Sequence, residues 1–144
     1  MAQVGRPLKF KTEKEFIDYL ILNAEFWVDD LLNSNIKNID REWYLVKMKS
    51  FGANKPRIDL SITTNDNRRI GVEVKNPKNI FGELSRTISQ LLSYAVLAEE
   101  NGNPFDELVI ITSEYDDILI KVIKKYKLPI RIFLIDKQFH CEII

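Results

Sequence analysis

The chain has 144 residues, of which 45% are hydrophobic and 29% charged, and its 21 basic and 21 acidic side chains cancel to zero net charge. This balance predicts one folded domain with a real core, and it excludes a disordered chain and a globally basic nucleic-acid binder. No apolar run is long enough for a membrane span or a signal peptide, and the single cysteine allows no intrachain disulfide, so we expect a cytoplasmic protein without a membrane role.

The N-terminal part of the sequence predicts a short arm followed by a long helix. Residues 1–11 form a basic arm, and residues 12–144 are expected to form a single domain. Thr12 is a suitable cap for a helix that runs to about Leu32, where an Asn-rich stretch at 33–38 ends it. Apolar residues recur along this helix at the spacing of one buried face: Phe16, Leu20, Ala24, Trp27, Val28 and Leu31.

Three strands follow this helix, and after them helices and strands alternate along the chain. Strand patterns at 43–49, 57–64 and 69–75 are separated by turn-forming residues. A helix at about 82–100, a buried strand at 108–111, a helix at 114–127 and a strand at 130–135 follow, and residues 139–144 are a candidate edge strand. This order favours an α/β fold whose mixed sheet begins as a meander and continues with parallel crossovers.

The second and third strand patterns predict a hairpin with a defined register. Apolar and polar residues alternate in both strands, so each strand has one apolar face. If the chain turns about Asp66, every opposed pair on that face is apolar, and a slip of one residue would break this agreement. The pairs are Leu60 with Val72, Ile62 with Ile70 and Ile58 with Val74.

The same register sets Asp59 opposite Glu73, with Lys75 facing the same way. Opposed residues have Cβ atoms about 5 Å apart, where two carboxylates require a proton or a cation between them. Oxygen ligands suit Mg²⁺ or Mn²⁺, and a lysine beside them can orient a water or offset charge on a phosphate. Ser, Thr and Gly neighbours predict open space above the carboxylates. The alternative is an exposed ladder of charges that contributes little.

The following helix carries Gln90 and Tyr94 four residues apart on its polar side. An amide and a phenol at this spacing would suit a helix beside a phosphate site. A polar side is also the ordinary surface of an amphipathic helix.

Asp59, Glu73-Val74-Lys75 and Gln90-Leu91-Leu92-Ser93-Tyr94 together resemble the PD-(D/E)XK, or restriction-endonuclease-like, superfamily with the Q-x-x-x-Y helix of its RecB-type branch. The resemblance covers about residues 12–112 and implies an α-β-β-β-α-β core with a mixed sheet flanked by helices. It implies that Asp59 and Glu73 bind the metal, that Lys75 serves catalysis, and that Gln90 and Tyr94 line the site. It also implies a further glutamate on the first helix, for which Glu13 is the first choice and Glu25 the alternative.

Two features depart from the family pattern. Pro56 lies three residues before Asp59 instead of next to it, and the only histidine is His140, so the histidine that RecB-type enzymes place before the first acid is missing. The second departure puts the assignment to that branch in doubt.

The resemblance implies a Mg²⁺- or Mn²⁺-dependent nuclease, most simply an endonuclease that hydrolyses DNA phosphodiester bonds. The alternative is the same fold without catalysis, as a module that binds DNA or a protein. Basic residues of the arm and of two net-basic stretches are the candidates for DNA contacts, although they also fit a plain solvated surface: Arg6, Lys9, Lys11, Arg57, Lys78 and Arg86. A homodimer or higher homo-oligomer would suit a double-strand cutter, but nothing in the sequence demonstrates one.

Overall fold

The computed structural model describes residues 10–44, 57–75, 80–114, 117–136 and 141–143. This part of the chain forms four helices and six strands. In chain order they are α1 (Glu13–Leu22), α2 (Ala24–Leu32), β1 (Ile36–Tyr44), β2 (Arg57–Thr64), β3 (Arg69–Lys75), α3 (Ile80–Glu100), β4 (Glu107–Thr112), α4 (Asp117–Lys125), β5 (Ile130–Ile135) and β6 (Cys141–Ile143).

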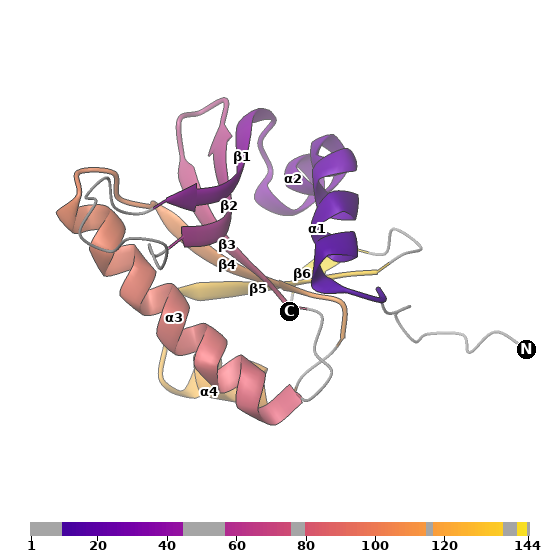
Figure 1. The fold of residues 1–144 in the computed structure, drawn as a ribbon, viewed down its shortest axis with the longest axis vertical. Helices are drawn as coiled ribbons and strands as arrows, with labels where there is room; N and C mark the ends of the chain where they lie inside the picture. The colour runs from indigo at the N-terminus through magenta and orange to yellow at the C-terminus, as the bar shows by residue number, and fades with distance from the viewer. Residues whose placement is uncertain (1–9, 45–56, 76–79, 115–116, 137–140, 144) are drawn as a thin grey trace, which may run out of the picture.

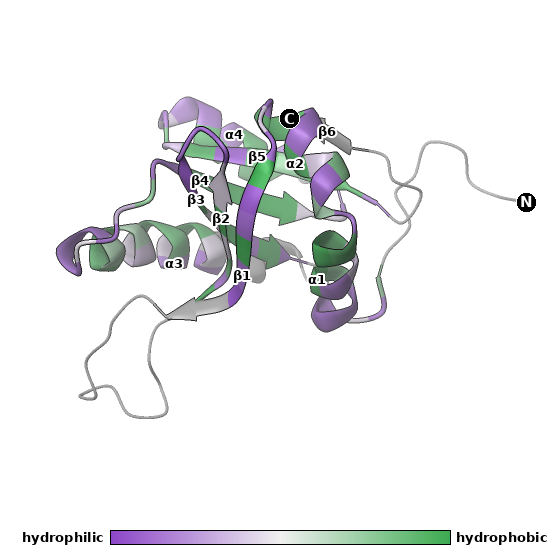
Figure 2. Ribbon diagram, turned by 90° about the horizontal axis from the view of Figure 1, so that it is seen from above, coloured by the Kyte–Doolittle hydropathy of each residue, from purple (hydrophilic) through white to green (hydrophobic). Residues whose placement is uncertain are grey.

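The six strands form one mixed sheet in the order β1-β2-β3-β4-β5-β6. β1, β2 and β3 are antiparallel neighbours, β3, β4 and β5 run parallel, and β6 returns antiparallel to β5. The helices cover the two faces of the sheet in pairs, with α1 and α2 on one side and α3 and α4 on the other (Figure 1). The strands in the middle of the sheet are largely hydrophobic, whereas the helices carry both kinds of residue (Figure 2). The result is a three-layered α/β domain.

Most of the elements lie where the sequence predicts them. The bounds of β2 and β3 and of β5 agree with the expected 57–64, 69–75 and 130–135. The predicted helix at 82–100 begins two residues earlier, at Ile80, and the helix predicted at 114–127 is described only from Asp117 to Lys125. The candidate edge strand at the C-terminus is present as β6. Long runs of β-branched residues between turn formers therefore identify these strands reliably.

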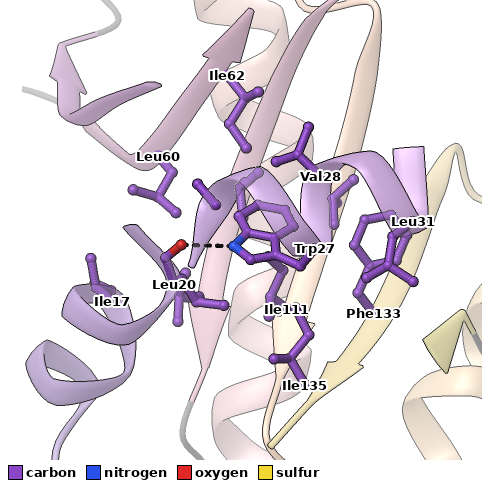
Figure 3. Close-up of a cluster of buried hydrophobic side chains, with 14 of the residues drawn as sticks. Ile17, Leu20, Trp27, Val28, Leu31, Leu60, Ile62, Ile111, Phe133 and Ile135 are labelled. Carbon is purple, nitrogen blue, oxygen red and sulfur yellow. Dashed lines mark hydrogen bonds between the residues drawn. The ribbon is translucent and has the colours of Figure 1, made fainter. Parts of the chain in front are cut away.

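The prediction of a single helix from 12 to about 32 is wrong, because the helix is divided at Asn23. The Asn23 side chain donates a hydrogen bond to the Tyr19 carbonyl at 2.9 Å, and its backbone N–H reaches the same oxygen. Asparagine readily replaces helical backbone bonds in this way. The break frees the carbonyl of Leu20, and the Trp27 indole N–H donates to it at 2.7 Å inside the core (Figure 3). The buried face predicted for the long helix is nevertheless buried throughout.

The first strand was placed too late in the sequence. β1 begins at Ile36, inside the Asn-rich stretch that was expected to end the helix, and residues 45–49 of the predicted strand lie outside the described residues. β1 is an edge strand with an irregular register between Ile36 and Asn38. Such a strand needs neither strict alternation nor strong β-formers, so its sequence gives only a weak signal.

Two arginines and a glutamate hold the end of the sheet at which β3, β4 and β5 begin. The two carboxylate oxygens of Glu107 accept hydrogen bonds from Arg68 at 2.7 Å and from Arg131 at 2.9 Å. The same guanidinium groups also donate to the carbonyls of Leu32 and Leu31, the last residues of α2. These carbonyls have no partner within the helix, and positive charge is favourable at a helix C-terminus, so this cluster fixes α2 to the sheet.

The described end of the expected N-terminal arm belongs to the core. Phe10 is only 4% exposed and stacks on Phe16, with 4.3 Å between the ring centroids. The packed domain therefore begins before residue 12. Within the described ranges, none of the helices has the length and apolar character that a membrane span requires.

The Trp27 hydrogen bond generates a prediction about stability. Replacing Trp27 by Phe removes the donor, leaves the buried Leu20 carbonyl unsatisfied and opens a small cavity, so the free energy of unfolding should fall by about 2 kcal/mol or more. Urea titration measures this change. Leu22→Ala, at a side chain that is 84% exposed, is the control, and it should change the free energy by no more than about 0.5 kcal/mol. Equal losses in the two variants would contradict the role given to the indole.

Candidate metal centre

The candidate site lies where β2 and β3 separate. Their ladder pairs Leu60 with Val72 and Ile62 with Ile70, which confirms two of the three predicted apolar pairs. The ladder between β2 and β3 ends at Leu60 and Val72, and it does not continue to Asp59 and Ile58. β2 nevertheless stays paired with β1 as far as Arg57, and β3 stays paired with β4 as far as Lys75. The sheet is thus open between its second and third strands, next to Asp59 and Glu73.

Carboxylates take over the role of the missing ladder bonds. Asp59 Oδ2 accepts the backbone N–H of Val74 at 2.9 Å, and Glu73 Oε1 accepts the backbone N–H of Asp59 at 3.3 Å. Each acid therefore satisfies a backbone donor of the chain segment opposite it, as buried backbone groups require. The predicted meeting of Asp59 and Glu73 across the hairpin is present, though their backbones are not a ladder pair.

The two acids differ in burial, and this difference decides where a proton resides. Glu73 is only 4% exposed, whereas Asp59 is partly exposed. Burial, followed by the negative charge of Asp59, raises the pKa of Glu73 to about 8, against the opposing effects of the Asp59 N–H and the charge of Lys75. At neutral pH the pair therefore holds one proton when no cation is present. This is the condition that the sequence predicted for two carboxylates at this distance.

Lys75 and Tyr94 both lie within electrostatic reach of the pair. Lys75 is the last residue of β3, is partly exposed, and its charge lowers the pKa of Glu73. Burial raises the pKa of the Tyr94 phenol, and the charges of Glu73 and Asp59 raise it further. The phenol is therefore a stable neutral donor near the acids. Gln90 is partly buried one helical turn before Tyr94, on the same side of α3.

Among the described residues, the glutamate expected on the first helix does not join Asp59 and Glu73 in a group that could hold a metal ion. Glu13 lies in the first turn of α1 and Glu25 in that of α2, and both helices pack on the face of the sheet opposite to α3. Across the described ranges, no three His, Cys, Asp or Glu side chains gather in a group that could hold a metal ion. Two carboxylates remain. Mg²⁺ is commonly held by one or two carboxylates together with waters and substrate phosphates, so the donor set fits such an ion.

The residues predicted to contact DNA are only partly described. Arg57, the first residue of β2, and Arg86 on α3 are exposed, each on an element that contributes to the site. Lys11 is exposed before α1, and its backbone N–H donates to Glu15. Arg6, Lys9 and Lys78 lie outside the described residues.

The expectation of open space beside the carboxylates is wrong at Gly71. A Cβ atom added there would lie 2.8 Å from Ile58 Cδ1 and 3.1 Å from the Phe105 ring. Ile58, predicted to pair with Val74 on the apolar face of the hairpin, packs instead with the cluster under α3 and α4. Sequence reasoning missed Ile58, Gly71 and the Val74 N–H as parts of the site. A glycine inside a strand often marks a close approach, and that was the available signal.

The pKa of Glu73 predicts how stability depends on pH without metal. In the unfolded chain its pKa is near the ordinary 4.5, and in the folded protein it is about 8. The folded state therefore keeps a proton that the unfolded state loses, so stability is complete below about pH 4.5 and falls as pH rises towards 8, by at most about 1.4 kcal/mol per unit. Urea unfolding in EDTA at several pH values measures this slope.

Glu73→Gln should flatten that slope between pH 5 and 8, because the amide cannot ionise. Glu25→Gln, the same exchange at an exposed position on α2, should leave it as in the wild type. A slope that persists in Glu73→Gln would mean that another group holds the proton.

Comparisons with known proteins support the fold of this site. No protein-family model matches the chain, and no curated protein matches it by sequence. Among solved structures, it is similar to the crystal structure of a repair endonuclease from Pyrococcus abyssi, with a TM-score of 0.59 and 14% sequence identity. The match covers 88% of this chain but only 48% of that protein, so the chain spans about half of its neighbour's length. The chain has a restriction-endonuclease-like α/β fold, in which a mixed sheet is flanked by helices.

Proposed function

We propose that this chain is a divalent-metal-dependent nuclease that hydrolyses DNA phosphodiester bonds, acting as an endonuclease. The observation that carries the proposal is the pair of Asp59 and the buried Glu73, which needs a proton or a cation, with Lys75 beside it. The fold supports it, since the similar solved structure is a repair endonuclease. Strongly shifted acids of this kind are also more common at functional sites than elsewhere.

Asp59 and Glu73 are the residues proposed to hold Mg²⁺ or Mn²⁺, in place of the proton that they share. Such an ion, when bound, polarises a phosphate and makes a bound water more acidic. Asp59 is oriented for this role by the Val74 N–H, because that bond fixes one of its two oxygens. Its carboxylate is proposed to face the cation together with that of Glu73.

Lys75 and Tyr94 supply hydrogen-bond donors beside that position. The Lys75 ammonium is proposed to orient the attacking water and to offset the negative charge that grows on the phosphate. Tyr94 keeps its proton because its pKa is raised, so it donates to a phosphate oxygen instead of repelling it. Gln90, one turn earlier on α3, extends the same row of donors along the substrate.

The proposed DNA backbone contacts are those of exposed cations near the acids. Arg57 lies two residues before Asp59 on β2, and Arg86 lies one turn before Gln90 on α3. Arg6, Lys9, Lys11 and Lys78 remain candidates from the sequence. Phosphate contacts of this kind would make binding weaken steeply with salt. Cleavage of both strands would require two copies of the site, so a homodimer is part of the proposal.

The first test is cleavage of supercoiled, linear, single-stranded and branched DNA with and without Mg²⁺. Lys75→Ala should reduce Mg²⁺-dependent cleavage about a hundredfold or more, as expected for loss of a group that acts on a proton in the reaction. Its melting temperature should stay within a few degrees of the wild type, because Lys75 is the last, partly exposed residue of β3.

Lys124→Ala on α4 is the matched control, since it removes an exposed lysine far from the acids in the sequence. It should cleave as the wild type does. Full activity of Lys75→Ala would contradict the role of this lysine in the proposal.

Calorimetry with Mn²⁺ separates the nuclease from a module that only binds. The wild type should bind Mn²⁺ and release protons as it does so, because the cation displaces the proton of the pair. Asp59→Ala should abolish this binding. DNA binding without any Mn²⁺ binding by the wild type would overturn the nuclease proposal and favour the binding module.

A further inference from the structure

We infer that Ile58 and Gly71 together position the Asp59 carboxylate. Ile58 crosses to the α3 face of the sheet and occupies the space that the missing side chain of Gly71 leaves. This inference deepens the proposed function, because it names the residues that build one half of the metal site. Neither residue is proposed to contact the metal ion or the substrate, so both are positioning residues.

The first step is the change of face along β2. In a regular strand, Ile58, Leu60 and Ile62 would point the same way. Leu60 and Ile62 do lie in the cluster under α1 and α2, but Ile58 lies in the cluster under α3 and α4 and is fully buried there. The backbone must therefore rotate between Ile58 and Leu60. Asp59 lies between these two residues.

The second step is the room that Ile58 needs on its new face. Gly71 faces the same side as Glu73, and Ile58 Cδ1 lies 2.8 Å from the position of a Cβ at residue 71. Real Cβ atoms do not approach other atoms so closely, so any other residue at this position would displace the Ile58 side chain. A Cβ here would meet Ile58 Cδ1, the end of a flexible side chain, so Gly71 leaves the space that Ile58 fills, and no unusual backbone angle is involved.

The third step is that the other neighbour of Gly71 is held in place. The Phe105 ring, 3.1 Å from the same Cβ position, lies under the Arg69 guanidinium, which is 4.6 Å from the ring centroid. Arg69 in turn donates hydrogen bonds to the carbonyls of Asn103 and Pro104, on the two residues before Phe105. The ring is therefore backed by its own loop, and Ile58 is confined between it and β3.

The consequence for Asp59 follows from its position between the two anchored residues. With Leu60 fixed on one face and Ile58 on the other, the Asp59 side chain is directed between the strands, where Oδ2 meets the Val74 N–H at 2.9 Å. In a regular strand, the Asp59 side chain would instead point to the α3 face, directly beside Glu73, and would not lie between the two strands. The anchoring of Ile58 thus turns the Asp59 carboxylate from the α3 face of the sheet into the gap between β2 and β3.

The experiment introduces a steric clash between residue 71 and Ile58 and then removes it with a second substitution. Gly71→Ala should displace Ile58, so that Mn²⁺ affinity and Mg²⁺-dependent cleavage fall roughly tenfold to a hundredfold, as for the loss of a group that supports a metal ligand. In EDTA, the Val74 amide proton should move upfield and exchange faster in the NMR spectrum, since its bond to Asp59 is weakened. The double variant Ile58→Val with Gly71→Ala removes Cδ1 and should recover most of each loss.

A matched pair of truncations covers the case in which Gly71→Ala does not fold. Ile58→Ala and Ile132→Ala remove the same side chain from the same hydrophobic cluster. Only Ile58→Ala should weaken the Val74 amide hydrogen bond and Mn²⁺ binding, although both variants lose stability. Equal effects on Val74, or no recovery in the double variant, would overturn the positioning role.

The Val74 amide separates this inference from the proposed function. It reports the placement of Asp59 in the protein without metal or DNA. If the wild type neither binds Mn²⁺ nor cleaves DNA, the nuclease proposal fails while the NMR comparison still decides whether Ile58 and Gly71 position the carboxylate.

Discussion

The opening of the sheet between β2 and β3 depends on the meeting of two acids that repel each other. Asp59 and Glu73 lie where the ladder between their strands ends, and each accepts a backbone N–H that the ladder would otherwise have satisfied. A closed ladder at this point would stack both carboxylates on one buried face, with no donor for either. The open arrangement supplies donors and leaves the pair to share a proton or a cation. The chemistry proposed for the chain and the local irregularity of its sheet therefore have the same origin.

A fold of this kind does not by itself supply an activity, since function resides in the groups that a fold presents. The similarity to a repair endonuclease accounts for the arrangement of the sheet and helices. The case for catalysis rests on Glu73, whose raised pKa is unusual for a structural glutamate, and on the lysine two residues later. The two helix pairs also divide the molecule: α3 carries Tyr94 near the acids, whereas α1 and α2 pack on the opposite face of the sheet.

The sequence predicted the strands and the acids well because both follow from local patterns. Alternation in β2 and β3 identified their bounds and the register from Leu60 to Ile62, and hence the encounter of Asp59 with Glu73. It failed at Ile58, because alternation places this residue on the face of Leu60, whereas the structure buries it in the cluster under α3 and α4, beside Gly71. It also failed at Asn23, where a side-chain bond to Tyr19 ends a helix whose apolar spacing continues unbroken. The periodicity of a sequence does not reveal tertiary contacts that override it, and one such contact lies directly beside the candidate site.

The cluster of Arg68, Glu107 and Arg131 gives the opposite end of the hairpin a contrasting character. Arg68 follows the turn between β2 and β3, and its guanidinium is held at once by Asp66, by Glu107 and by the Leu32 carbonyl. One end of the two strands is thereby locked against sliding, while the end at Asp59 has already parted. At that open end β2 stays paired with β1 and β3 stays paired with β4, so the outer strands, and not the hairpin itself, hold Asp59 and Glu73 at their separation.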